Sequence, residues 1–117
     1  MILGPKVLLK LVKKIKLVEN LDERELTTPE GAGFDIRLGE VHKLDGGKAY
    51  LGITHRETPK VISKLKYQSA GRRTKIQSIT IKPGEFYLLS SIETFNIPLN
   101  LTVNFKPRTT LFRSGLF

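Results

Sequence analysis

The residues that decide the predicted fold are LNLTVNFK, which run from Leu99 to Lys106. Apolar side chains occupy every second position of this segment, and polar or charged side chains occupy the positions between them. A period of two places the apolar side chains on one face of an extended chain. The segment therefore predicts a β-strand with one covered face.

Short apolar runs separated by glycine and proline extend this pattern over most of the chain. The segment Asp45-Gly46-Gly47 predicts a hairpin turn between two such runs, and Pro83-Gly84 predicts a second turn. Strands at short, regular spacing with this punctuation are typical of a β-sandwich or a β-barrel. The predicted strands cover residues 34–38, 41–44, 49–53, 76–81 and 86–89.

One helix is predicted, near the beginning of the chain. Between Gly4 and Val18, apolar side chains recur at helical spacing, lysines fill much of the remaining circumference, and Pro5 suits a first turn. This pattern predicts an amphipathic helix of about three turns. The interspersed lysines exclude a secretory signal peptide, and packing on the rest of the domain is favoured over a position on a membrane surface.

The length and composition indicate one small domain, covering residues 1–117, with 39% apolar and 26% charged residues. A chain of this length buries only about two-thirds of its unfolded surface, so contacts between subunits would help to stabilise it. The sequence contains no cysteine and two histidines, which excludes disulfides, cysteine nucleophiles and the common zinc sites. No apolar run approaches the roughly 20 residues that span a bilayer, and we expect a cytoplasmic protein.

The net charge of +9 indicates an anionic partner. Nucleic acid, an acidic membrane and phosphorylated small molecules are the candidate classes. Residues 58–84 carry seven lysines and arginines and no acidic residue. However, Tyr67 is the one aromatic side chain there that could stack on bases, so a solvated basic loop is favoured over nucleic-acid binding.

The last eleven residues carry the densest set of candidate ligand-binding side chains. Arg108 and Arg113 are five residues apart, Thr109 and Thr110 lie between them, and Ser114 and a glycine follow. Arginine presents paired donors that match phosphate oxygens, hydroxyl groups add short neutral donors, and glycine lets backbone N–H groups come close. The segment therefore predicts a polyphosphate pocket, with an ordinary basic loop at a strand end as the alternative.

A second candidate is Asp35, which directly follows the glycine turn Gly31-Ala32-Gly33 and begins a predicted strand. A carboxylate in such a place can face a pocket and hold a hydrated magnesium ion. Aspartate is also common at turns for purely local reasons, and the residues alone leave this alternative open.

Together these segments resemble the dUTPase and dCTP deaminase superfamily. Residues 29–39, PEGAGFDIRLG, resemble its first motif, residues 83–98 its central hairpin, and residues 107–115 its phosphate-binding motif. The opening Met1–Leu3, followed by a helix, is similar to dCTP deaminases. Residues 50–60 resemble archaeal-type dUTPases more closely. The ordered motifs cover nearly the whole chain, which is identified as an archaeal-type dUTPase-like member.

The resemblance implies a homotrimer of distorted jelly-roll barrels with active sites between subunits. The implied substrate is a deoxypyrimidine nucleoside triphosphate, dUTP or dCTP, bound with Mg²⁺. It also implies that Asp35 lies near the metal and contacts it through water. The residues that it assigns to phosphate binding are Arg108, Thr109, Thr110, Arg113 and Ser114.

One departure from the family bears on catalysis. Members of the family carry their catalytic carboxylate on strands that follow the phosphate motif, an aspartate in dUTPases and a glutamate in the deaminases. They also carry a later glycine-rich motif that closes over the nucleotide. This sequence ends at Phe117, and none of its 11 acidic residues follows Arg108. We therefore expect a truncated chain with little or no hydrolase activity, whose missing strands leave an exposed sheet edge or apolar groove.

Three functions remain open at this stage. A dUTP diphosphatase, which converts dUTP to dUMP and pyrophosphate, is favoured by Gly31–Gly33 and by residues 50–60. A dCTP deaminase that works without zinc is the first alternative, because zinc-dependent deamination needs cysteine ligands that the chain lacks. A catalytically inactive nucleotide-binding or regulatory module is the second.

Overall fold

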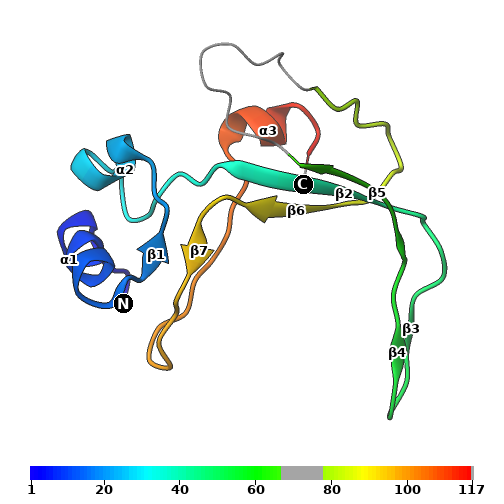
Figure 1. Ribbon diagram of the computed structural model, residues 1–117, viewed down its shortest axis with the longest axis horizontal. Coiled ribbons are helices and arrows are strands. Elements are labelled where there is room, and N and C mark those ends of the chain that lie inside the picture. The colour runs from blue at the N-terminus through cyan, green and yellow to red at the C-terminus, as the bar shows by residue number, and fades with distance from the viewer. Residues whose placement is uncertain (67–77, 117) are drawn as a thin grey trace.

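The computed structural model describes residues 1–66 and 78–116. The described residues include 78–81 of the strand predicted at 76–81. The basic segment 72–75 lies outside them. Within these ranges the chain is mainly β, as the sequence predicts (Figure 1). The helices are α1 (Pro5–Ile15), α2 (Glu23–Thr27) and α3 (Thr109–Arg113). The strands are β1 (Val18–Glu19), β2 (Leu38–Leu44), β3 (Tyr50–Leu51), β4 (Arg56–Glu57), β5 (Val61–Lys66), β6 (Tyr87–Ser91) and β7 (Thr94–Phe95).

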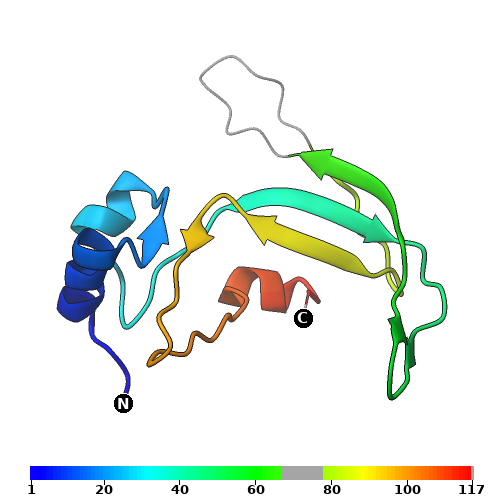
Figure 2. The ribbon, with the colours of Figure 1, turned by 60° about the horizontal axis from the view of Figure 1, so that its bottom comes forward.

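The central element is an antiparallel sheet with the strand order β5-β2-β6. Val41, in the middle of β2, lies opposite Leu65 of β5 and Leu89 of β6, and it is only 2% exposed. Figure 2 shows this curved sheet with α3 on one side of it, α1 and α2 beyond one end, and the β3–β4 hairpin beyond the other. The sheet therefore connects the N-terminal elements to the last part of the chain.

The predicted amphipathic helix is confirmed as α1, with Pro5 at its start. Lys16 ends the helix in the left-handed conformation, with φ 52°, and its N–H donates to the carbonyl of Leu11. The chain can then turn and bury Leu17 and Val18 directly after the helix. Of the helices in the described ranges, none combines the length and the apolar content that crossing a bilayer requires.

The pairing of β1 with β7 joins the two halves of the sequence. Val18 lies opposite Phe95, and the Asn96 N–H donates to the Leu17 carbonyl at 2.9 Å. The Asn96 side-chain amide also donates to the Lys16 carbonyl, at 2.7 Å. These bonds place α1 and α2 beside the start of the chain segment that leads to α3.

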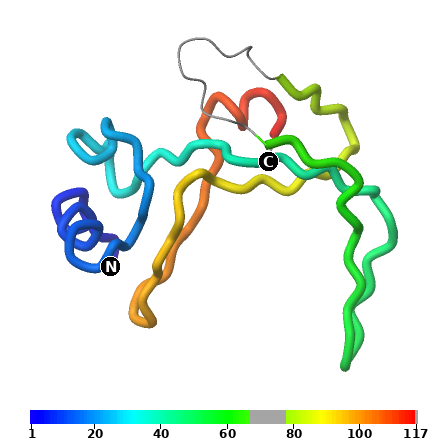
Figure 3. The backbone as a smooth tube through the Cα atoms, viewed as in Figure 1, coloured from blue at the N-terminus to red at the C-terminus, as the bar shows by residue number. Residues whose placement is uncertain are grey.

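The hairpin predicted around Asp45-Gly46-Gly47 is wrong. The strand before it, β2, pairs with β5 and β6, whereas β3 pairs with β4. The Asp45 carboxylate accepts the N–H groups of Gly47 at 2.8 Å and of Lys60 at 3.1 Å. This segment therefore leads the chain out of the sheet into the projecting β3–β4 hairpin (Figure 3) rather than turning it back.

The strand predicted over residues 99–106 is also wrong. Among the described residues this segment has no strand partner. Leu99 is fully exposed, and Phe105 makes an edge-to-face contact with Phe95 at a centroid distance of 5.1 Å. The alternation of side chains is real in the sequence, but a strand also needs a neighbour that takes its backbone hydrogen bonds.

Two further predicted strands differ in extent. Of residues 34–38, only Leu38 belongs to a strand, β2, and no strand is assigned over residues 78–81. Two helices, α2 and α3, were not predicted. Asp22 caps α2 by accepting the Arg24 N–H at 3.1 Å.

A charged cluster joins β2 to the start of β6. Lys43 and Tyr87 lie opposite each other on the two strands, and both donate to Glu85, with Lys43 Nζ 2.5 Å from one carboxylate oxygen. These bonds hold the pKa of Glu85 below its ordinary value and raise the pKa values of Lys43 and Tyr87. The cluster therefore keeps its ion pair throughout the neutral pH range.

The chain leaves much apolar surface uncovered. Its accessible surface is 10293 Å², against about 6,400 Å² for a compact protein of this mass. Its radius of gyration is 17.1 Å, against about 13 Å for a compact chain of this length. Leu88 and Leu89 are neighbours on β6 and point to opposite faces, yet they are 55% and 60% exposed. The described strands form one three-stranded and two two-stranded sheets, and none of these closes into a barrel.

Gly39 allows the close approach of β2 and β6, where the register shifts. A Cβ atom at Gly39 would lie 2.8 Å from the carbonyl oxygen of Ser91 and 3.1 Å from the N atom of Ile92. We predict that Gly39→Ala lowers the free energy of unfolding by about 1–3 kcal/mol, because backbone atoms must move. Urea denaturation measures the change.

Gly33→Ala is the matched control, since a Cβ atom at Gly33 would meet nothing within 4 Å. It should leave the free energy of unfolding within about 1 kcal/mol of the parent. Equal losses in the two variants would contradict the close contact between Gly39 and Ser91.

Candidate functional site

The structure brings together Asp35 and Arg108, the acid from the glycine-turn segment and the first arginine of the C-terminal segment. Arg108 Nη1 lies 2.9 Å from Asp35 Oδ2. The Arg108 side chain is 63% exposed and the Asp35 side chain 37% exposed. Because water reaches both groups, Arg108 can exchange Asp35 for an anionic ligand, and Asp35 can exchange Arg108 for a cationic one.

The segment after Arg108 is the short helix α3 rather than a loop. The Phe112 N–H donates to the Arg108 carbonyl at 3.0 Å, and Gly115 ends the segment with φ 79°. The Ser114 hydroxyl donates to the Thr110 carbonyl at 2.8 Å, so its proton is held by the helix itself. Thr109 and Thr110 are exposed in the first turn, next to Arg108.

Arg113, the second predicted phosphate ligand, lies at the far end of α3 from Arg108. It is exposed, and it forms no ion pair with any residue in the described ranges. The structure therefore pairs one of the two predicted arginines with Asp35 and leaves the other open to solvent.

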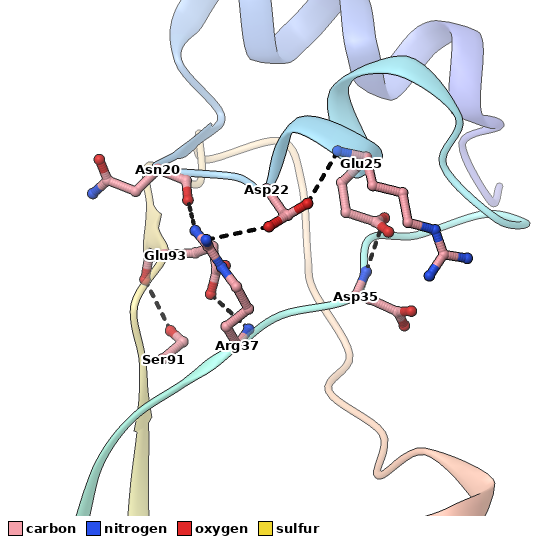
Figure 4. Close-up of polar contacts among 8 residues, drawn as sticks. Asn20, Asp22, Glu25, Asp35, Arg37, Ser91 and Glu93 are labelled. Atoms are coloured by element: carbon pink, nitrogen blue, oxygen red, sulfur yellow. Dashed lines mark hydrogen bonds and ion pairs between the residues drawn. The ribbon is translucent and has the colours of Figure 1, made fainter. Parts of the chain in front are cut away.

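Asp35 is held in place by its backbone. The chain turns at Gly31, which has φ 67°, and then runs to β2 without joining a strand. The Asp35 N–H donates to Glu25 Oε2 at 3.1 Å, and Glu25 belongs to α2 (Figure 4). Glu25 is 3% exposed. A buried carboxylate on a helix thus replaces the strand neighbour that would otherwise accept this N–H.

Two residues further on, Arg37 is held in a similar way. Its N–H donates to Glu93 Oε2 at 2.9 Å and its Nε to Glu93 Oε1 at 2.7 Å. Its other guanidinium nitrogens reach the Asp22 carboxylate at 3.4 Å and the Asn20 carbonyl (Figure 4). Glu93 has a fully buried side chain, and Ser91 donates its hydroxyl to the Glu93 carbonyl at 2.8 Å.

The sequence did not reveal Glu25 or Glu93 as parts of the site. Acidic residues near turns are usually exposed, and nothing in the spacing of these two marks them as buried. The one available signal was Arg37, a cation inside an apolar alternation, which requires a partner once it is partly covered. Glu93, the acidic residue nearest to Arg108 in sequence, is committed to that partner.

The donor set at Asp35 is one carboxylate, which is compatible with a hydrated magnesium ion and does not enclose a metal by itself. No group of three His, Cys, Asp or Glu side chains that could enclose a metal ion occurs in residues 1–66 and 78–116. Mg²⁺ commonly takes one or two carboxylates and completes its shell with water and phosphate oxygens. The half-exposed Asp35 carboxylate could contact such an ion through its water shell.

The fold and the site define a β-rich protein in which a half-exposed carboxylate and an exposed arginine from distant segments form an ion pair. The chain belongs to the dCTP deaminase-like family, which matches residues 2–117. This confirms the resemblance to the dUTPase and dCTP deaminase superfamily and places the chain in nucleotide metabolism. No solved structure matches it.

The Glu93–Arg37 contact predicts a large effect on stability. We predict that Glu93→Ala lowers the free energy of unfolding by about 2–3 kcal/mol, because it removes a buried acceptor from two donors of Arg37. Glu57→Ala, at an exposed position of β4, should change it by less than about 0.5 kcal/mol.

A double-mutant cycle separates the pair from its surroundings. In the Glu93→Ala background, Arg37→Ala should cost at least about 1 kcal/mol less than it does in the parent chain. Costs that simply add would show that the two side chains are not coupled.

Proposed function

We propose that this chain binds the triphosphate of a deoxypyrimidine nucleotide and is a dUTP diphosphatase-like protein, whose reaction yields dUMP and pyrophosphate. The observation that carries this proposal is the contact between Arg108 and Asp35, at 2.9 Å in an exposed position. An arginine and a carboxylate that neutralise each other in the free chain are matched to a ligand that brings phosphate oxygens and a divalent cation together.

Phosphate oxygens would be bound by α3 and the residue before it. Arg108 and Arg113 would supply paired donors, and the exposed Thr109 and Thr110 hydroxyl groups would supply shorter ones. Ser114 would donate to phosphate only after it releases the Thr110 carbonyl.

Asp35 would act on the metal side of the same ligand. Once Arg108 turns to phosphate, the Asp35 carboxylate becomes available to accept hydrogen bonds from magnesium-bound water. Bound Mg²⁺ would supply neutralisation of the phosphate charge. The exchange of partners leaves neither Arg108 nor Asp35 without a counter-charge at any stage.

The buried glutamates do not serve as the base that hydrolysis needs. A general base must reach the water that it activates. Glu25 and Glu93 are 3% and 4% exposed, and both hold peptide N–H groups of the segment that carries Asp35. Nucleotide binding is therefore assigned to the exposed groups, and hydrolysis is tested separately by assaying the products.

The exposed apolar surface supports an assembled state. Leu88, Leu89 and Phe86, together with the exposed residues of β5, give the open sheet more uncovered apolar area than an isolated protein of this size normally has. We propose a cytoplasmic homotrimer in which this surface is covered and distorted jelly-roll barrels are completed, with active sites between subunits.

Two other functions share the phosphate site. The family description favours a dCTP deaminase, which releases ammonia and dUTP. A regulatory module would bind the nucleotide without turnover.

The test is a calorimetric titration of the full chain with dUTP and with dCTP in the presence of Mg²⁺. We expect Arg108→Ala to weaken binding at least about tenfold, because a charge-assisted hydrogen bond to phosphate is lost. Arg56→Ala removes the same charge from the exposed β4 strand and should change the affinity by less than about twofold.

Products then separate the three functions. Pyrophosphate release from dUTP supports the diphosphatase, ammonia release from dCTP supports the deaminase, and binding without either product supports the regulatory module. Absence of binding to both nucleotides, or equal losses in the Arg108 and Arg56 variants, would contradict a phosphate site at α3.

A further inference from the structure

Glu25 is a buried acidic residue without a cationic partner. It is 3% exposed, and it forms no ion pair with any residue of the described ranges. The other buried acidic residue among them, Glu93, has the Arg37 guanidinium at 2.7 Å. Buried carboxylates normally have such a partner, because removal from water is costly. The free-energy cost of burying the Glu25 carboxylate is therefore not offset by an ion pair within the described residues.

The contact that Glu25 does make is with the backbone of Asp35. Its Oε2 atom accepts the Asp35 N–H at 3.1 Å. Residues 34–37 belong to no strand, so neighbouring strands do not fix this peptide. The Asp35 N–H and its side chain belong to the same residue, so a bond that holds the peptide limits the directions that the Cα–Cβ bond can take. Glu25 thus restrains the backbone that carries the Asp35 carboxylate, and this carboxylate contacts Arg108.

We infer that Glu25 is a positioning residue, which holds the Asp35 peptide so that the Asp35 carboxylate meets the magnesium shell of a triphosphate bound at Arg108. This inference rests on the proposed function, because Glu25 acts only through Asp35. It assigns the buried carboxylate to the metal-dependent part of binding and not to the phosphate contacts of α3.

The sharpest readout is the gain in dUTP affinity that Mg²⁺ produces, taken as the ratio of Kd in EDTA to Kd with Mg²⁺. We expect a gain of about tenfold or more in the parent chain. Glu25→Ala should reduce the gain to below about threefold, because a misplaced carboxylate loses the metal shell. Its Kd in EDTA should stay within about twofold of the parent. A purely structural role would weaken both.

Two variants serve as controls. Glu25→Gln keeps an oxygen that can accept the Asp35 N–H, and it should retain the gain. Glu23→Ala removes the same charge from the same helix at an exposed position, and it should also retain the gain.

A double-mutant cycle tests whether Glu25 acts through Asp35. Asp35→Ala alone should abolish the Mg²⁺ gain, and adding Glu25→Ala to it should change the Kd by less than about twofold. A further loss in the double variant would overturn the positioning role.

Hydrogen exchange of the Asp35 amide, followed by NMR, reads the contact without any nucleotide. We expect protection in the parent and in Glu25→Gln, and exchange at least about tenfold faster in Glu25→Ala. The amides of β2 should keep their protection, which shows that the variant is folded. An unchanged exchange rate at Asp35 would overturn the inference.

The outcomes distinguish this inference from the function on which it rests. If the parent binds neither dUTP nor dCTP, the proposed function fails and the role of Glu25 in binding fails with it. If the parent binds and Glu25→Ala keeps the full Mg²⁺ gain, or Glu23→Ala loses as much, the positioning role fails while the proposed function stands.

Discussion

Two buried carboxylates hold the segment on which the candidate site depends. Glu25 accepts the N–H of Asp35, and Glu93 accepts the N–H of Arg37. Residues two apart in an extended chain direct their N–H groups to the same side, so the pair replaces one missing strand neighbour. One acceptor comes from α2 and the other from the loop before β7. The position of Asp35 therefore requires that the N-terminal elements and the second half of the chain be folded together, which the β1–β7 pairing ensures.

The site combines this rigid support with exposed working groups. The Glu93 carboxylate is fully buried beneath a partly exposed Arg37, whereas water reaches both groups of the Asp35–Arg108 pair. A buried carboxylate is costly to separate from its partner, while an ion pair with both groups exposed contributes little to stability and exchanges readily. The two ion pairs therefore fit different tasks, the first in fixing the backbone and the second in meeting a ligand.

The sequence could predict the amphipathic helix and the candidate site residues, but it could not predict which segments pack against each other. The helix α1 follows from its apolar spacing, and Asp35 and Arg108 follow from their motifs. The residues around Asp45-Gly46-Gly47 looked like a hairpin, because a period of two reveals which face is apolar and not which strand lies alongside. The strand predicted over residues 99–106 was wrong for the same reason. Glu25 and Glu93 were missed because burial of a carboxylate depends on distant donors that no local pattern shows.

The most direct test is an NMR titration of the isotopically labelled chain with dUTP and Mg²⁺. Binding should shift the backbone amide signals of residues 34–37 and 108–114 together, at the same nucleotide concentration, while the signals of the β3–β4 hairpin stay unchanged. Shifts confined to α1 or to the β3–β4 hairpin, without any shift at residues 34–37, would contradict the account.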